Sequence, residues 1–194
     1  MKTPRLHATH AGFTLVEVMV ALLVISIGLL GIAKMQALAL SSTASARLRS
    51  LGALEAASLS TMMGADRSYW ASSATTATPL TITVQNGAIS NSSDVNITGT
   101  PNCSYPATCT VATQMATYDL NNWATALNAV LPNALATISC SQPAAVAPNP
   151  SSPVSCSIQI QWAENLVQSN SAQSAAAAAA AAANTPQYTV VVQP

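Results

Sequence analysis

Charged residues are scarce in this chain. Of its 194 residues, 6 are Lys or Arg and 6 are Asp or Glu, so charged residues make up 6% and the formal net charge is zero. Soluble proteins typically contain about 25% charged residues, so an ordinary cytosolic domain is a poor fit. The few scattered cations cannot form the basic stripe that phosphate contacts require, and we expect no nucleic-acid partner.

Aromatic residues and histidine are also scarce. Aromatics make up 4%, so a core must consist mainly of smaller apolar side chains. Both histidines, His7 and His10, precede the first apolar segment, the acidic residues are isolated in sequence, and there is no glycine-rich phosphate loop. We therefore expect no catalytic arrangement, no cofactor and no metal site, and we do not expect an enzyme.

One long apolar segment stands out against this background. From Phe13 to Ala33 the sequence FTLVEVMVALLVISIGLLGIA contains one charged residue, Glu17. About 20 apolar residues are enough for a helix to cross roughly 30 Å of hydrocarbon, and a cleavable secretory signal has a shorter apolar region. The preceding cations, Lys2 and Arg5, favour a cytoplasmic N-terminus. The segment therefore predicts a membrane-spanning helix.

Glu17 is unusual inside such a helix. A buried acid costs roughly 2.5–3.5 kcal/mol at the centre of a membrane helix and less near an end, so a partner is expected. A cut between Gly12 and Phe13 would create an α-amino group one helical turn from Glu17. We hypothesise that this amine, from the same or a neighbouring chain, neutralises the carboxylate.

Residues 12–18, Gly-Phe-Thr-Leu-Val-Glu-Val, follow a short basic leader and begin the apolar helix. This arrangement resembles the processing signature of type IV pilins and pseudopilins. The resemblance implies cleavage between Gly12 and Phe13 by a membrane prepilin peptidase and N-methylation of Phe13. It also implies that Glu17 pairs with the N-terminal amine of an adjacent subunit. Loss of the leader would leave four cations against six anions.

Two further regions are similar to the PilV-type minor pilins, also called type IV pilus modification proteins. This resemblance implies a precursor that crosses the inner membrane once, with its N-terminus cytoplasmic and its C-terminal region periplasmic. The mature form would then join other minor and major pilins in a surface pilus, near its tip, and support assembly, adhesion to an unidentified surface ligand, or twitching motility. The regions that carry it are Val20–Ala33 with Gln36, and Asp119, Trp123, Leu127 and Leu131-Pro132 followed by a cysteine-containing segment and Trp162.

We expect four parts along the chain: a cleaved leader (1–12), an apolar helix for the membrane and the filament core (13–34), an amphipathic continuation of that helix (35–65) and an exported domain (66–194). Apolar residues recur every three to four positions from Leu48 to Met62, which predicts that the continuation packs on the exported domain. The helix is interrupted by Gly28, Gly31 and Gly52, each costing about 1 kcal/mol relative to Ala.

The exported domain shows strand and helix patterns that predict the α+β class, with the long helix packed on a small antiparallel sheet. Trp123 and Trp162 are interpreted as core residues. The predicted elements are strands at Leu80–Val84, Ser157–Trp162 and Tyr188–Gln193, an Asn86-Gly87 turn followed by an apolar segment at Val95–Thr98, and a short helix from Asp119 to Leu131 that ends at Pro132.

All four cysteines, Cys103, Cys109, Cys140 and Cys156, follow the apolar helix. In a periplasmic domain such cysteines form disulfides, and four cysteines allow three connectivities. Chain order favours Cys103 with Cys109 and Cys140 with Cys156. A zinc site is disfavoured because no pair has two-to-four-residue spacing and both histidines lie in the leader.

Ala175–Ala183 is an unbroken alanine tract near the end of the chain. One interpretation is a surface helix that contacts a partner, and the other is a length-tolerant insertion between two strands. Two alternatives to the pilus function also remain. A minor pseudopilin of a type II secretion system would carry the same N-terminal signature, whereas a membrane-anchored periplasmic binding module that never polymerises would keep its leader.

Overall fold

A computed structural model describes residues 12–75, 77–144, 152–164 and 185–194 of the protein. The chain divides into two compact units, Met1–Ser42 and Thr43–Pro194. We call the second unit the head. The leader before Gly12 and the tract Ala175–Ala183 lie outside the described residues.

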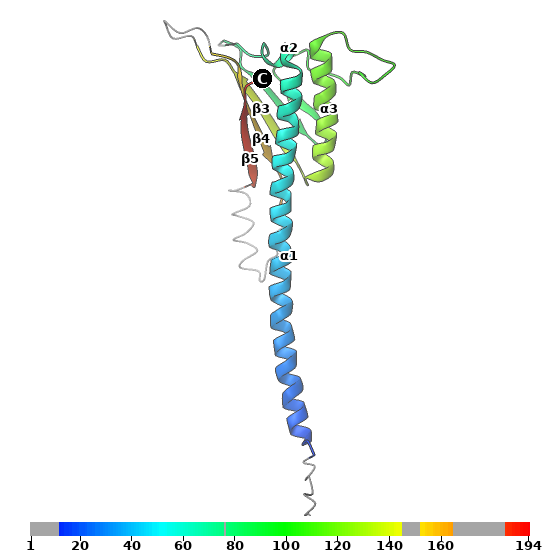
Figure 1. The fold of residues 1–194 in the computed structure, drawn as a ribbon, viewed down its shortest axis with the longest axis vertical. Helices are drawn as coiled ribbons and strands as arrows, with labels where there is room; N and C mark the ends of the chain where they lie inside the picture. Colours follow the sequence, from blue (N-terminus) through cyan, green and yellow to red (C-terminus); the bar gives the residue numbers. More distant parts are fainter. Residues whose placement is uncertain (1–11, 76, 145–151, 165–184) are drawn as a thin grey trace, which may run out of the picture. The chain divides into compact units, whose positions relative to one another are not determined.

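Helix α1 (Leu15–Ala65) contains 51 residues in one uninterrupted segment, close to the predicted span (Figure 1). Within the head, its buried residues are Gly52, Ala56, Leu59 and Met63, at spacings of four, three and four. This spacing places them on one face of the helix. The amphipathic character of the second half is thereby confirmed, although Leu54 lies off the buried face and is 64% exposed.

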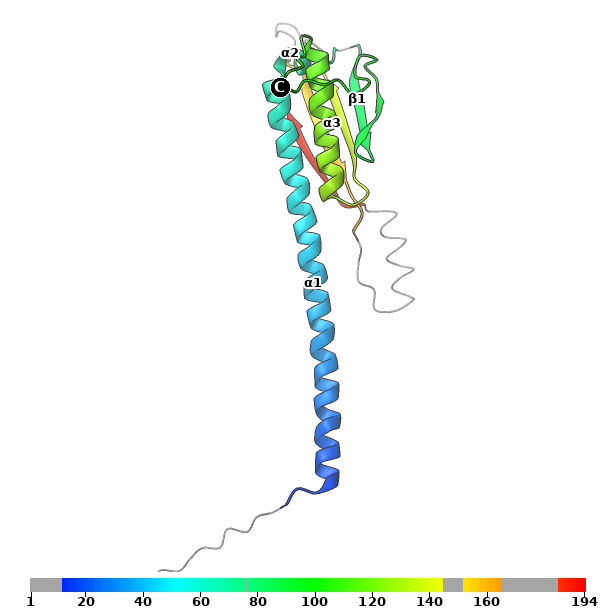
Figure 2. The same ribbon diagram turned by 90° about the vertical axis from the view of Figure 1, so that its right-hand side faces the viewer.

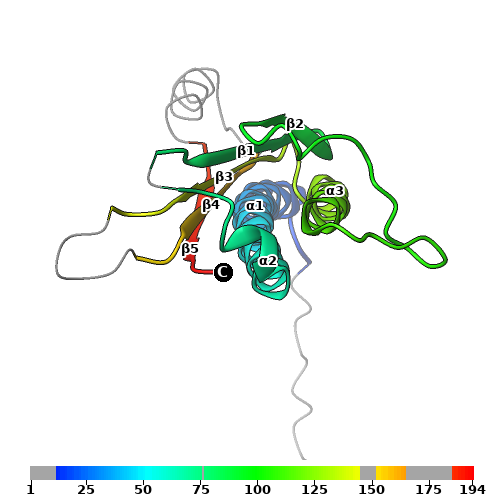
Figure 3. The ribbon, with the colours of Figure 1, turned by 90° about the horizontal axis from the view of Figure 1, so that it is seen from above.

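The described residues of the head form an antiparallel sheet of five strands, seen from two sides in Figures 1 and 2, and Figure 3 labels its order, β2-β1-β3-β4-β5. Together with α1 it confirms the predicted α+β architecture of a long helix packed on a small antiparallel sheet. The strands β4 and β5 agree with the predicted ones to within two residues at each end, whereas β3 has no counterpart among them. The bounds are β1 (Leu80–Gln85), β2 (Ala88–Ser92), β3 (Leu135–Ser141), β4 (Ser155–Gln161) and β5 (Gln187–Val192).

The predicted Asn-Gly turn joins β1 to β2. Asn86 and Gly87 both have positive φ angles, of 53° and 76°, as a two-residue type I′ hairpin turn requires. The returning strand is the polar segment Ala88–Ser92, so the apolar segment Val95–Thr98 forms no strand and instead lies in the following loop. The polar side chains of β2 are compatible with its position, because β2 is an edge strand and none of its residues is fully buried.

Helix α3 (Ala112–Val130) begins seven residues before the predicted Asp119. Its N-cap residue, Val111, makes no side-chain capping hydrogen bond, so the sequence has no capping signal at this point. The helix ends immediately before Leu131-Pro132, as predicted. The short helix α2 (Arg67–Trp70) follows α1 and contacts α3.

The head part of α1 and helix α3 lie on the same face of the sheet, and the core lies between them and the strands (Figure 3). Trp123 and Trp162 are only 1% and 2% exposed, which confirms their interpretation as core residues. The sheet contributes alternate residues to the core, among them Ile82, Val84, Ala136, Ile138, Ile158 and Ile160.

Two disulfides join the four cysteines in the pairing that chain order favours. Cys103 is bonded to Cys109, six residues away, within the loop that precedes α3. Cys140 is bonded to Cys156, and these residues lie directly opposite each other in the β3–β4 pair. The second disulfide therefore covalently joins the central strand β3 to its neighbour β4 inside the core.

Candidate functional site

The expected cleavage position lies outside regular secondary structure. Gly12, Phe13 and Thr14 precede the first turn of α1. The Phe13 side chain is 84% exposed, and a Cβ at Gly12 would have no atom within 4 Å. A peptidase could therefore reach the peptide bond between Gly12 and Phe13 without unwinding the helix.

Thr14 caps the N-terminus of α1. The backbone N–H of Glu17 donates to the carbonyl oxygen of Thr14 at 3.1 Å and lies 3.3 Å from its Oγ1. Thr14 and Glu17 thus occupy the first and last positions of the Thr-x-x-Glu capping pattern. Sequence reasoning did not use this pattern, although it is visible in the residues. Cleavage before Phe13 would leave the cap intact.

Glu17 lies in the first turn of α1. The positive end of the helix dipole favours a carboxylate at this position. The Glu17 side chain is exposed, and the described part of the chain contains no ion pair that involves it. The carboxylate is therefore accessible at the N-terminal end of the helix.

The residues after Glu17 form an apolar helical surface. The most apolar 18-residue window of α1 has a mean hydropathy of 2.7, and none of that window is buried. The Ser26 hydroxyl donates to the Leu23 carbonyl at 2.8 Å, so it leaves no unsatisfied donor in an apolar environment. An apolar surface of this size requires cover by lipid or by other protein chains. It includes Leu15, Val18, Leu22, Ile25, Leu29, Ile32, Met35 and Leu40.

A family model described as the prokaryotic N-terminal methylation motif matches residues 8–33. The motif supports a type IV pilin-like protein. The matched residues include Gly12, Phe13 and Glu17 and the first half of the apolar helix. The motif implies processing by a prepilin peptidase and assembly with other pilins, and it fits a membrane-anchored precursor that later enters a pilus or pseudopilus. Comparisons with curated proteins and with solved structures found no match.

Glu164, which sequence reasoning missed, links helix α1 to the segment that follows β4. One carboxylate oxygen accepts hydrogen bonds from the Trp162 indole N–H at 3.1 Å and lies 3.6 Å from Arg49 Nε. The other accepts from the Ser45 hydroxyl at 2.7 Å. Because the Glu164 side chain is 8% exposed, these contacts hold α1 against the sheet in a nearly buried position.

A second set of contacts lies where α1 ends. The Tyr69 hydroxyl donates to Asp94 Oδ2 at 2.9 Å. Burial acts to raise the pKa of Asp94, but hydrogen bonds from Asn96 and Tyr69 outweigh it and lower this pKa below its usual value. Burial, with a smaller contribution from the charge of Asp66, raises the pKa of Asp119. Three acidic residues, Asp66, Asp94 and Asp119, therefore gather at this end of the head.

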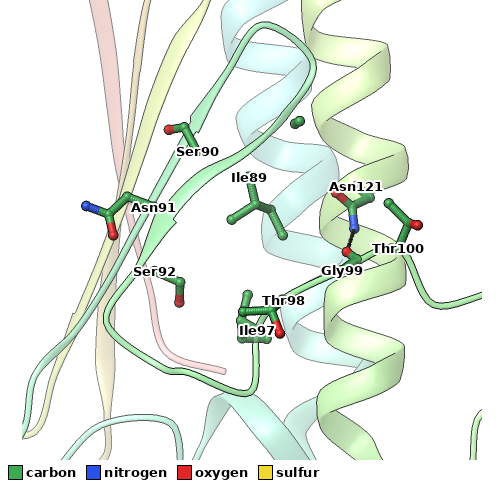
Figure 4. A pocket seen from close by; sticks show the side chains of 10 residues that line it. Ile89, Ser90, Asn91, Ser92, Ile97, Thr98, Gly99, Thr100 and Asn121 are labelled. Atoms are coloured by element: carbon green, nitrogen blue, oxygen red, sulfur yellow. Dashed lines mark hydrogen bonds between the residues drawn. The ribbon is translucent and has the colours of Figure 1, made fainter.

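A surface pocket of about 480 Å³ lies between β2, the segment 97–100 and α3 (Figure 4). Ile89 points into it, and Asn91 points away. The Ser92 hydroxyl bonds to the backbone of Asp94, and the Asn121 amide donates to the Gly99 carbonyl at 3.0 Å. These hydrogen bonds hold the segment 97–100 and the residues before it against β2 and α3. The residues that line the pocket include no titratable side chain.

The described residues contain no group of three or more His, Cys, Asp or Glu that could hold a metal ion. The four cysteines are joined in disulfides. Glu164 and Asp94 accept several hydrogen bonds from neighbouring side chains and backbone.

Proposed function

We propose that this protein is a minor pilin of a type IV pilus. A prepilin peptidase cleaves it between Gly12 and Phe13, the Phe13 amine is methylated, and the mature chain joins other minor and major pilins in a priming complex near the pilus tip. The observation that carries this proposal is the methylation motif at the start of an exposed apolar helix. Its role is to support assembly, adhesion or twitching motility.

The location follows from the same features. The precursor spans the inner membrane once, with its N-terminus in the cytoplasm and the head in the periplasm. The two disulfides of the head support export, because disulfides persist in the oxidising periplasm and are rare in the cytosol. After assembly the apolar helix leaves the bilayer and packs among the helices of other subunits.

The processing step is tested by Gly12→Val. We expect this variant to keep its leader, because a branched side chain occupies the position that the peptidase must accommodate. Gly28→Ala is the matched control: Gly28 lies in the apolar helix, and a Cβ there also has no atom within 4 Å. A mature N-terminus at Phe13 in Gly12→Val would contradict the proposed cleavage.

The assembly role of Glu17 is tested by Glu17→Gln, with Glu17→Asp as the control that keeps the charge. Glu17→Gln retains the shape of the side chain and the backbone bond to Thr14, but without the negative charge it cannot form an ion pair with the N-terminal ammonium group. We expect a strong loss of recruitment into pili for Gln and a smaller loss for Asp. Equal incorporation of Glu17→Gln and the wild type would refute the pairing.

The alternative is a minor pseudopilin of a type II secretion system, for which the same motif is equally suitable. Detection of the protein in sheared surface pili supports the pilus, whereas retention in a periplasmic assembly together with a secretion defect on deletion supports the pseudopilin. An uncleaved leader and independence from the peptidase would instead indicate a membrane-anchored binding module that does not polymerise.

A further inference from the structure

Three Asn-x-Ser/Thr sequences lie close together in the head, between residues 91 and 104. This pattern is the acceptor for N-linked glycans and belongs on the surface of exported proteins. Because so short a pattern recurs by chance, the local structure has to decide which asparagine an enzyme can use. The three sequences are Asn91-Ser92-Ser93, Asn96-Ile97-Thr98 and Asn102-Cys103-Ser104.

The first of them, at Asn91, is committed to the sheet. Asn91 lies in β2 and is paired with Thr83 of β1. The Ser93 hydroxyl accepts a hydrogen bond from the backbone N–H of Thr81 at 2.8 Å. An enzyme that binds the hydroxyl of the pattern would therefore have to detach this edge of the sheet, which makes Asn91 a poor acceptor.

The third, at Asn102, lies in the loop that the Cys103–Cys109 disulfide closes, three residues before the 96% exposed Tyr105. The Asn102 side-chain oxygen accepts hydrogen bonds from the backbone N–H of Ser104 at 3.0 Å and from its hydroxyl at 2.7 Å. The hydroxyl of this pattern is thus bound to its own asparagine. Because the disulfide also limits how far the segment can extend, Asn102 is a poor acceptor as well.

The second, at Asn96, lies in the turn after β2, outside both the sheet and the disulfide loop. The Asn96 side chain is exposed, and so are Thr98 and Val95, the latter to 79%. The Thr98 hydroxyl donates to the carbonyl oxygen of Val95 at the long distance of 3.4 Å. The hydroxyl of this pattern is therefore released at little cost, and a sugar on Asn96 would extend into solvent.

An acidic residue, Asp94, stands two positions before Asn96. At the other two asparagines this position holds Ile89 or Thr100, so the longer pattern acid-x-Asn-x-Thr occurs once in this region. The acid offers a transferase a charged group to bind beside the acceptor amide, and bacterial glycosylation of asparagine uses this longer pattern. Asp94 Oδ1 also accepts hydrogen bonds from the Asn96 backbone N–H at 2.9 Å and from its side-chain amide at 3.0 Å. A glycosylated amide keeps one N–H and can still donate to Asp94.

We propose that Asn96 is the acceptor of an N-linked glycan in the periplasm. The side-chain nitrogen of Asn96 attacks the anomeric carbon of a sugar carried on a polyprenyl pyrophosphate. A C–N bond forms and the bond from the anomeric carbon to the pyrophosphate oxygen breaks. The amide proton passes to a base of the transferase, and the pyrophosphate leaves. This inference rests on the proposed function for the periplasmic location of the head.

The core contacts of this segment fix the order of events. Ile97 is 1% exposed and belongs to the core, and Asp94 accepts a hydrogen bond from the Tyr69 hydroxyl at 2.9 Å. A transferase has to hold residues 94–98 in an extended conformation, and both contacts oppose this in the folded head. The sugar is therefore transferred to the exported chain before the head closes, and folding leaves Asn96 outside.

The test is mass spectrometry of the full-length protein, purified from the cells that naturally produce it and reduced before digestion. Cleavage before each aspartate separates peptide 94–118, which contains Asn96, from peptide 66–93, which contains Asn91. We expect peptide 94–118 to carry a carbohydrate mass that fragmentation places on Asn96, and peptide 66–93 to carry none.

Thr98→Ala and Thr98→Ser form a matched pair of variants. Alanine removes the hydroxyl that the transferase binds, and serine keeps it. Both leave Asn96 and the buried Ile97 in place, so near-ultraviolet circular dichroism should show a native head in each. We expect the glycan at Asn96 to be lost in Thr98→Ala and retained in Thr98→Ser. An unmodified Asn96 in the wild type, a glycan on Asn102 instead, or equal occupancy in the two variants would overturn the proposal.

These readings separate the glycan from the proposed function. Protein that begins at Phe13 and is present in pili but has no sugar on Asn96 retains the proposed function and rejects the glycan. A sugar on Asn96 in protein that is absent from pili supports the glycan and rejects the pilus.

Discussion

The packing of α1 on the sheet predicts an unusual response to Gly52→Ala. Adding a Cβ at Gly52 would place it 2.9 Å from Cζ3 and 3.3 Å from Cη2 of the Trp162 ring. The ring cannot retreat easily, because Trp162 is 2% exposed and its indole N–H is bonded to Glu164. The ring therefore occupies the space that a side chain at position 52 would need, so glycine fits here despite its cost in helix propensity.

The magnitude follows from two opposing contributions. Replacing glycine by alanine inside a helix stabilises it by about 1 kcal/mol. Overpacking a filled core typically costs about 1–3 kcal/mol, and the fixed ring puts this site in the upper part of that range. We expect Gly52→Ala to lower the free energy of unfolding by about 1–2 kcal/mol, or a few degrees in Tm for a unit of this size.

Gly64→Ala in the same helix is the matched control. A Cβ at Gly64 has no atom within 4 Å, so only the propensity gain applies, and we expect stabilisation of up to about 1 kcal/mol. Thermal unfolding of the mature chain in detergent, followed by near-ultraviolet circular dichroism, measures both variants. Equal stabilisation by the two substitutions would refute the close packing of α1 on Trp162.

Three other predictions concern contacts of the head. Replacing Cys140 and Cys156 together by serine opens a 17-residue loop and should lower the free energy of unfolding by about 3 kcal/mol in denaturant titrations. Glu164→Ala should cost about 1–3 kcal/mol because a buried indole N–H loses its acceptor, whereas Glu164→Gln keeps an acceptor and should cost less. Tyr69→Phe removes a hydrogen bond to Asp94 and should raise the pKa of that carboxyl in an NMR titration. Because the folded-state pKa of Asp94 is lowered, its contribution to stability is lost as pH falls through that pKa, and Tyr69→Phe should move this loss to higher pH.

Much of the fold could be predicted from local patterns in the sequence. The apolar run from Phe13 and the periodic residues after Leu48 define α1 because their repeat matches the helix over many turns. The alternation from Ser157 to Trp162 defines β4 because one face of the strand is buried. Both sequence patterns are strong because the helix and the strand each bury one face, so apolar residues recur at the period of that element.

The remaining features depend on contacts between distant residues. Strand β2 contains mostly polar residues and exists because Asn86-Gly87 returns the chain alongside β1. Helix α3 begins early without a capping side chain, so packing on the core rather than a local signal fixes its start. The role of Gly52 becomes visible only when Trp162, 110 residues later, lies against it.

In the candidate site, too, local sequence motifs can be predicted, whereas contacts between distant residues cannot. Gly12, Phe13 and Glu17 are predicted from the sequence because their motif is contiguous; the family match spans these residues, and their roles stay predictions. Two other features could not be predicted from the sequence, because each is a property of the folded head. They are the contacts of Glu164 with Ser45 and Arg49 and the exposure of Tyr105.

The most direct test of the account is the mass of the N-terminal peptide of the protein, purified from cells with and without an active prepilin peptidase. With the peptidase, we predict a chain that begins at Phe13 with a methylated amine. Without it, we predict a chain that retains residues 1–12. A protein that keeps its leader in the presence of the active peptidase would contradict the central claim.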